Sequence, residues 1–140
     1  MAYIDTSVLV AYYCPERFSG AAQRAVKRVK EPAISPLVEV ELYSAVALKV
    51  RTRELDAATA RRIIAPLQEH VASGYYKIVP IEAREYRLAR DWIGRFSVPL
   101  RGPGALHLAA AFANGLVLVT ADKNLARSAK HFGVKHKLVS

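Results

Sequence analysis

Residues 116–122 have the sequence LVLVTAD, in which four apolar residues are followed by Thr120, Ala121 and the acid Asp122. An unbroken apolar run of this length predicts a strand buried on both faces, as strands of parallel sheets are. The residues that follow, from Lys123 to about His131, predict a helix. A buried strand that leads into a helix is the repeating unit of α/β folds. Asp122 therefore stands between a strand and a helix.

The same unit occurs at the start of the chain. Residues 2–5 (AYID) form a short apolar run that also ends in an acid, and they predict a buried strand. A short helix to about Tyr13 should follow, and capping of that helix is the expected role of Thr6, with Ser7 as the other candidate cap. Further strands are expected at 33–35, 76–81 and, at an edge, 134–139. Further helices are expected at 17–30, 36–51, 56–74, 82–96 and 105–113.

This alternation of strands and helices predicts an α/β fold, a parallel sheet covered by helices on both faces. The Gly/Pro-rich segment 97–104 (SVPLRGPG) is expected to be a loop, and Pro66 could kink its helix. Ser35 followed by Pro36 is a strong helix start. A chain of 140 residues without repeats or linkers fits one domain, residues 1–140.

The composition narrows the class of partner. The formal net charge of +9 favours a polyanion such as RNA, DNA or an acidic protein segment, although a charge that serves only solubility is the alternative. Cys14 is the only cysteine, so no intrachain disulfide can form and no zinc site is indicated. The sequence has no signal peptide and no apolar run of the roughly 20 residues that span a bilayer, so the expected location is the cytoplasm.

Three carboxylates stand where a site in such a fold is expected. Ligands bind beyond the carboxyl ends of the strands of an open α/β sheet. Asp5 and Asp122 both follow apolar strands, and although one such acid could simply cap a helix, two on neighbouring strands indicate a site. Glu41 falls on or beside the apolar side of the helix expected at 36–51, and a partly buried carboxylate needs a cation or a hydrogen-bond donor. Glu39, two residues earlier, faces elsewhere and is expected to be solvated, and it is the alternative to Glu41 if the helix is placed differently.

The chemistry of these ligands favours a hard cation. Carboxylates without a neighbouring histidine or thiolate suit Mg²⁺ or Mn²⁺ better than zinc. Such an ion polarises phosphoryl oxygens and lowers the pKa of a bound water. Together with the basic surface, this predicts hydrolysis of a nucleic-acid phosphodiester. His107, in an almost wholly apolar helix, is expected to be a core histidine with one satisfied nitrogen.

At these residues the chain resembles the PIN-domain family, and within it the VapC-type toxins of toxin–antitoxin pairs. The similarity runs through YIDTSVLVAYY (3–13), ISPLVEVELYSAV (34–46) and LRGPGALHLAAAFANGLVLVTADKNLARSAKHFGV (100–134). Asp5, Glu41 and Asp122 occupy the places of family acids. The resemblance implies a three-layer α/β/α sandwich, an Mg²⁺- or Mn²⁺-dependent endoribonuclease, an RNA substrate, a homodimer and a small antitoxin protein as inhibitor.

The chain departs from the family pattern at Gly104. The family usually has an acid before ALHLA, whereas this chain has PGALHLA (103–109), and Asp91 is too distant in sequence to replace it. Three explanations remain open: a natural variant with weak or no nuclease activity, a laboratory change that reduces toxicity, or a site in which three carboxylates and waters still hold an ion.

Three functions therefore compete. The first is an RNA-cleaving toxin that an antitoxin silences. The second is a catalytically weak or inactive PIN-like module that binds RNA or an antitoxin. The third, a structure-specific DNA nuclease, is disfavoured because the short chain lacks inserts that would shape a duplex site.

Overall fold

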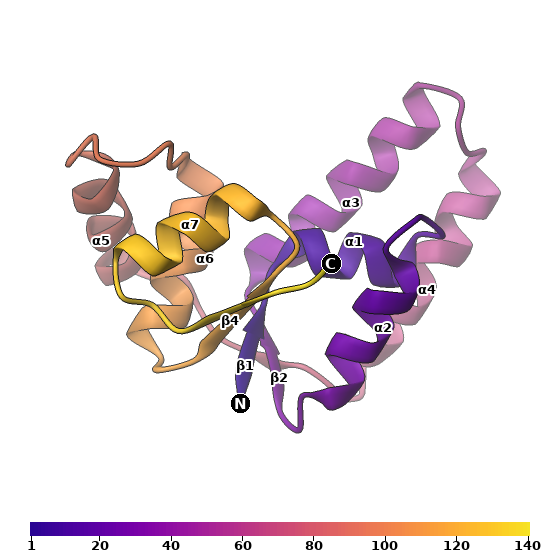
Figure 1. The fold of residues 1–140 in the computed structure, drawn as a ribbon. Coiled ribbons are helices and arrows are strands. Elements are labelled where there is room, and N and C mark those ends of the chain that lie inside the picture. The colour runs from indigo at the N-terminus through magenta and orange to yellow at the C-terminus, as the bar shows by residue number, and fades with distance from the viewer.

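A parallel sheet of five strands forms the centre of the molecule (Figure 1). The computed structural model describes all residues from Met1 to Ser140. The order across the sheet is β3-β2-β1-β4-β5, and every neighbouring pair is parallel. The strands are β1 (Ala2–Ile4), β2 (Pro32–Ile34), β3 (Lys77–Ile78), β4 (Val117–Thr120) and β5 (His136–Leu138).

Seven helices flank the sheet. They are α1 (Thr6–Tyr13), α2 (Ser19–Arg28), α3 (Pro36–Arg51), α4 (Ala57–Ala72), α5 (Ala83–Ile93), α6 (Gly102–Ala113) and α7 (Lys123–His131). Figure 1 shows α5, α6 and α7 on one side of the sheet and α1 and α2 on the other, with α3 and α4 packed beside α1. The predicted α/β fold with a parallel sheet between two helical layers is confirmed.

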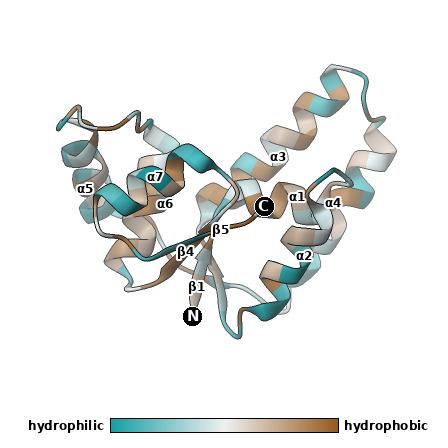
Figure 2. Ribbon diagram, viewed as in Figure 1, coloured by the Kyte–Doolittle hydropathy of each residue, from teal (hydrophilic) through white to brown (hydrophobic).

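The core follows the apolar pattern of the sequence. Tyr3, Ile4 and Leu118 on the two central strands are completely buried. Figure 2 shows apolar colours along β1, β4 and α1, and hydrophilic colours on the outer sides of α2 and α7. No helix of the chain is both long and apolar enough to cross a membrane.

Two predicted boundaries were wrong. The segment expected as a loop to residue 104 becomes helical at Gly102, because proline is compatible with the first turn of a helix, where its missing N–H has no intrahelical acceptor to lose. The strand expected at 76–81 is reduced to β3. Val79 still donates its N–H to the carbonyl of Ile34 (2.8 Å), but Pro80 has no N–H with which to extend the pairing. Pro66 lies within α4 and does not end it.

The sheet register brings the two predicted strand-end acids together. Ile4 of β1 lies opposite Val119 of β4, and the N–H of Asp5 bonds to the carbonyl of Val119 (3.1 Å). Both strands therefore end at the same edge of the sheet. Helices α1 and α7 start at this edge, so the first turns of both helices contribute to whatever site forms there.

Candidate functional site

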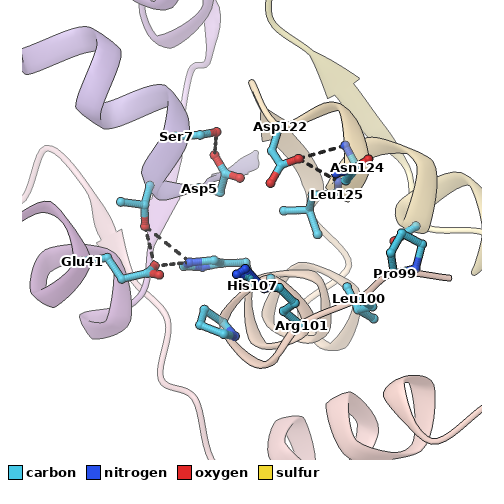
Figure 3. Close-up of a pocket in the computed structure, with 14 residues that line it drawn as sticks. Asp5, Ser7, Glu41, Pro99, Leu100, Arg101, His107, Asp122, Asn124 and Leu125 are labelled. Carbon is cyan, nitrogen blue, oxygen red and sulfur yellow. Dashed lines mark hydrogen bonds and ion pairs between the residues drawn. The ribbon is translucent and has the colours of Figure 1, made fainter. Parts of the chain in front are cut away.

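A cavity of about 400 Å³ lies beyond the carboxyl ends of β1 and β4. The starts of α1, α6 and α7 and the second turn of α3 form its walls (Figure 3). It is lined by Asp5, Thr6, Ser7, Glu41, Pro99, Leu100, Arg101, Pro103, Gly104, His107, Asp122, Asn124, Leu125 and Ser128. All three predicted acids thus share one cavity with the glycine that departs from the family pattern.

Asp5 is the most enclosed of the three acids, at 3% exposure. Its Oδ1 accepts hydrogen bonds from the Ser7 hydroxyl (2.6 Å) and the Val8 N–H (3.3 Å), and its Oδ2 accepts one from the Thr120 hydroxyl (2.6 Å). Burial raises the pKa of Asp5 above its ordinary value, although the bonds from Ser7 and Thr120 oppose that shift. Asp5 is therefore a desolvated carboxylate that is held in one orientation.

Asp5 is also the N-cap of α1, so the expectation that Thr6 or Ser7 caps this helix was wrong. The Asp5 carboxylate reaches the Val8 N–H, and Thr120 on β4 fixes it there. The hydroxyls of Thr6 and Ser7 are left to serve the acids of the cavity. The Ser7 hydroxyl also accepts a bond from the Ala121 N–H (2.9 Å), which ties α1 to the end of β4.

Asp122 caps α7 in the same manner. Its Oδ1 accepts from the N–H groups of Asn124 (2.8 Å) and Leu125 (3.2 Å). Figure 3 shows the carboxylates of Asp5 and Asp122 directed toward one another across the cavity. Two carboxylates on neighbouring strand ends therefore converge, as the sequence predicted.

Glu41 lies on a different wall, on α3, and it is paired. Its Oε1 accepts a hydrogen bond from the Thr6 hydroxyl (2.6 Å) and makes a short contact with His107 Nε2. Partial burial acts to raise the pKa of Glu41, but the hydrogen bonds from His107 and Thr6 outweigh it and lower that pKa below its ordinary value. Thr6 and His107 thus supply the hydrogen-bond donors that a partly buried Glu41 was expected to need.

His107 extends this pairing into the core, and the expectation of one satisfied nitrogen was wrong. Its Nδ1 bonds to the Tyr3 hydroxyl (2.7 Å), which in turn bonds to the Ser35 hydroxyl (2.7 Å). A neutral His107 with its proton on Nε2 satisfies the whole row, because Ser35 then donates to Tyr3, Tyr3 to Nδ1, and Nε2 to Glu41. Ser35 starts α3, as predicted, but its hydroxyl serves Tyr3 and does not cap the helix.

Gly104 is the third residue of α6, in the first turn. A Cβ at this position would lie 3.5 Å from Leu125 Cδ1 and 3.8 Å from Leu100 Cδ1, which are ordinary van der Waals distances. The backbone at this position therefore leaves room for a Cβ. No other acid replaces the expected one, since Asp91 is exposed and paired with Arg90 (3.1 Å), and Glu39 does not line the cavity.

Carboxylate oxygens of this type suit a hard divalent ion, but the three acids do not converge on one point. No group of three or more His, Cys, Asp or Glu side chains lies close enough together to hold a metal ion. Asp5 and Asp122 face one another, while Glu41 is turned toward His107. The geometry thus offers two convergent carboxylates, with the third on the opposite wall.

The match to a family model covers residues 2–131 and identifies a PIN domain. The chain belongs to the PIN domain family. Several solved structures share the fold. FitAcB from Neisseria gonorrhoeae is 17% identical with a TM-score of 0.72, over 97% of this chain and 96% of that one. VapC20 from Mycobacterium tuberculosis, described as a sarcin-ricin loop cleaving toxin, is 17% identical with a TM-score of 0.70, over 91% and 95% of the two chains.

A third structure, VapBC2 from Rickettsia felis bound to a fragment of its promoter DNA, is 17% identical with a TM-score of 0.66 over 100% of both chains. At these identities the similarity establishes the shared fold. A comparison with curated proteins found no match.

The sequence did not indicate the row of hydrogen bonds that runs from Glu41 through His107 and Tyr3 to Ser35. The sequence predicts Tyr3 and His107 as core residues and Ser35 as a helix cap. Only the spacing of His107 from Gly104, three residues along one helix, was available as a signal that His107 faces the cavity.

Proposed function

We propose that this PIN domain is a divalent-metal-dependent endoribonuclease that acts as the toxin of a toxin–antitoxin pair. One observation carries the proposal: the carboxylates of Asp5 and Asp122 face one another at adjacent strand ends, in a cavity that also contains Glu41. A cavity of about 400 Å³ has room for an ion with waters and for part of a nucleotide.

In this proposal Asp5 and Asp122 hold Mg²⁺ or Mn²⁺, and Glu41 contributes from the α3 wall. A bound ion would polarise a phosphoryl oxygen and lower the pKa of a water. The chain's own residues prepare the site for this. Ser7 and Thr120 orient the buried Asp5 carboxylate. Hydrogen bonds from His107 and Thr6 outweigh the partial burial of Glu41 and hold its pKa below the ordinary value.

The substrate and partner assignments rest on charge and on related proteins. A net charge of +9 on 140 residues favours a polyanion, and one neighbour of this fold is described as a sarcin-ricin loop cleaving toxin. Other neighbours are described as a toxin–antitoxin complex and as VapBC2, which supports a small antitoxin protein as the partner. We also propose that the chain is a cytoplasmic homodimer.

A cleavage assay tests the proposal. The purified chain is incubated with a mixed-sequence RNA in Mg²⁺, in Mn²⁺ and in EDTA, beside Asp5→Asn, Asp122→Asn and the control Asp91→Asn. We expect cleavage with either metal, none with EDTA, and a large loss in the two site variants only. Cleavage that persists in EDTA, or that Asp5→Asn leaves intact, would contradict the proposal.

A second function, a weak or inactive module that binds RNA or an antitoxin, is favoured by one specific observation. No three potential ligands are gathered within reach of one ion, and Gly104 supplies none. Calorimetric titration of Mn²⁺ into the chain and into Gly104→Asp separates the two functions. Binding by the chain itself supports the nuclease, whereas binding by Gly104→Asp alone supports the inactive module.

A further inference from the structure

The start of α6 presents unpaired hydrogen-bond donors at the cavity. The first intrahelical bond of α6 runs from the Ala105 N–H to the Arg101 carbonyl (2.9 Å), so the N–H groups of Gly102 and Gly104 precede the hydrogen-bond ladder. No side chain caps this helix, and its first turn contains no acid. The positive end of a 12-residue helix dipole is therefore uncompensated where the helix borders the cavity.

A second donor points independently to a ligand at the same place. Ser128, on α7, is 1% exposed and lines the same cavity. Its hydroxyl is the single buried side-chain polar atom of the protein that has no hydrogen-bond partner. Leaving a buried hydroxyl unpaired costs free energy, so native proteins usually satisfy such groups. No other group of the protein pairs with the Ser128 hydroxyl, so this hydroxyl is free to bond to a ligand.

Gly104 determines the charge of this corner of the cavity. An acid at position 104 would place a carboxylate among these donors, and a Cβ at this position meets its neighbours only at ordinary van der Waals distances. With glycine, the lining around this corner consists of Gly104 with its backbone N–H, Ser128, Arg101 and the apolar Leu100 and Leu125. Asp122 also lines the cavity, and its Oδ1 already accepts the N–H groups of Asn124 and Leu125 at the start of α7.

We propose that this corner, formed by Arg101, Gly104 and Ser128, is a phosphate-binding subsite. Helix N-termini bind phosphate through backbone N–H groups, and arginine adds a charge-assisted donor. The subsite would hold a phosphate of an RNA strand beside the paired carboxylates of Asp5 and Asp122. That assignment of the ligand to RNA rests on the proposed function, whereas the anion-binding chemistry does not. Substitution of the expected acid by Gly104 thus replaces a potential metal ligand with an anion site.

The test titrates inorganic phosphate and adenosine 3′-monophosphate separately into the full chain in EDTA. Acetate, titrated in the same way, is the comparison anion. Amide chemical shifts and calorimetry report binding. We expect saturable shifts centred on the amides of Gly104 and Ser128, and tighter binding of the nucleotide than of acetate. Shifts centred elsewhere, or equal affinity for acetate, would overturn the proposal.

Variants sharpen the test. Gly104→Asp should weaken phosphate binding by at least about tenfold, because it places a negative charge among the donors, whereas Gly104→Ala should retain binding. Ser128→Ala should weaken it by several-fold. Asp122→Asn should tighten it, since a like charge is removed while asparagine still caps α7. Unchanged affinity in both Gly104→Asp and Ser128→Ala would refute the subsite.

This outcome is separable from that of the proposed function. Phosphate binding is measured without metal and without cleavage. Binding at these amides by a chain that cleaves no RNA would leave the subsite standing and remove the nuclease. Metal-dependent cleavage without these amide shifts would support the nuclease and remove the phosphate subsite.

Discussion

At the scale of single residues, the three acids differ in burial, in hydrogen-bond partners and in how readily they ionise. Asp5 is desolvated and has a raised pKa, whereas Glu41 has a lowered pKa because its partners outweigh its partial burial. Asp122 is engaged through one oxygen by the start of α7. A cation in the cavity would thus benefit Asp5 most, since that carboxylate is the one whose ionised form the protein disfavours.

Asp5→Asn should stabilise the metal-free protein at neutral pH. Because the folded-state pKa of Asp5 is raised, its ionisation opposes folding, and stability is lost as pH rises from the ordinary aspartate range through the raised value. Relative to the parent in EDTA, the variant should gain free energy of unfolding across that range and then level off. Urea unfolding at a series of pH values measures this. Asp91→Asn, at an exposed site, is the control, and a parallel pH dependence of Asp5→Asn and parent would contradict the argument.

Tyr3→Phe should destabilise the protein by about 1–3 kcal/mol, because Ser35 and His107 would each lose a buried hydrogen-bond partner. The matched control is Tyr86→Phe, since Tyr86 is 57% exposed and should lose almost nothing. Chemical denaturation of both variants gives the comparison. Equal stability of the two variants would show that the row from Ser35 to Glu41 does not act through Tyr3.

At the scale of the elements, helix starts define the site. Asp5 and Asp122 each cap the helix that follows their strand, so one carboxylate serves both a helix and the cavity. Helix α6 differs, since it starts without a side-chain cap. A capping acid and a metal ligand are compatible roles because a carboxylate has two oxygens, and Asp122 uses only Oδ1 for capping.

Asp122→Ala should therefore lose two properties at once. Removal of the cap of α7 should lower the free energy of unfolding by about 1 kcal/mol, and Mn²⁺ affinity measured by calorimetry should fall sharply. Asp56→Ala is the matched control, because Asp56 caps α4 through the Thr59 N–H (2.7 Å) and does not line the cavity. It should lose stability and keep its metal affinity. Loss of Mn²⁺ binding in both variants would indicate a general effect of unfolding.

At the scale of the whole molecule, α3 carries exposed apolar side chains. Val40 and Leu48 lie two turns apart on this helix and are 66% and 51% exposed, and Figure 1 shows α3 projecting away from the sheet. The opposite side of α3 is committed to the core through Val38, Leu42 and Val46. Exposed apolar side chains on a projecting helix suit the proposed homodimer.

Val40→Glu should shift the protein toward monomer if α3 forms this interface, because a charge would be buried between two copies. Sedimentation velocity over a range of concentrations measures the change. Tyr86→Glu, on exposed α5, is the control and should leave the distribution unchanged. A parent that sediments as a monomer at every concentration would contradict the proposed homodimer.

The sequence by itself determined the class of fold and the position of the acids. Apolar runs followed by Asp5 and Asp122 mark strand ends, and parallel strands bring their carboxyl ends to one edge, so local pattern sufficed for both residues. Glu41 followed from helical spacing. The acid expected in place of Gly104 followed only from the resemblance to the PIN-domain family.

Only the tertiary structure decided what holds those acids. Thr120 and Asp5 are 115 residues apart, His107 and Glu41 are 66 apart, and Tyr3 and His107 are 104 apart. No local pattern encodes such pairs, because hydrogen-bond partners across a fold depend on which strands and helices become neighbours. The uncapped start of α6 was hidden for the same reason: glycine and proline there favour a loop locally, and the helix forms within a packed layer beside α5 and α7.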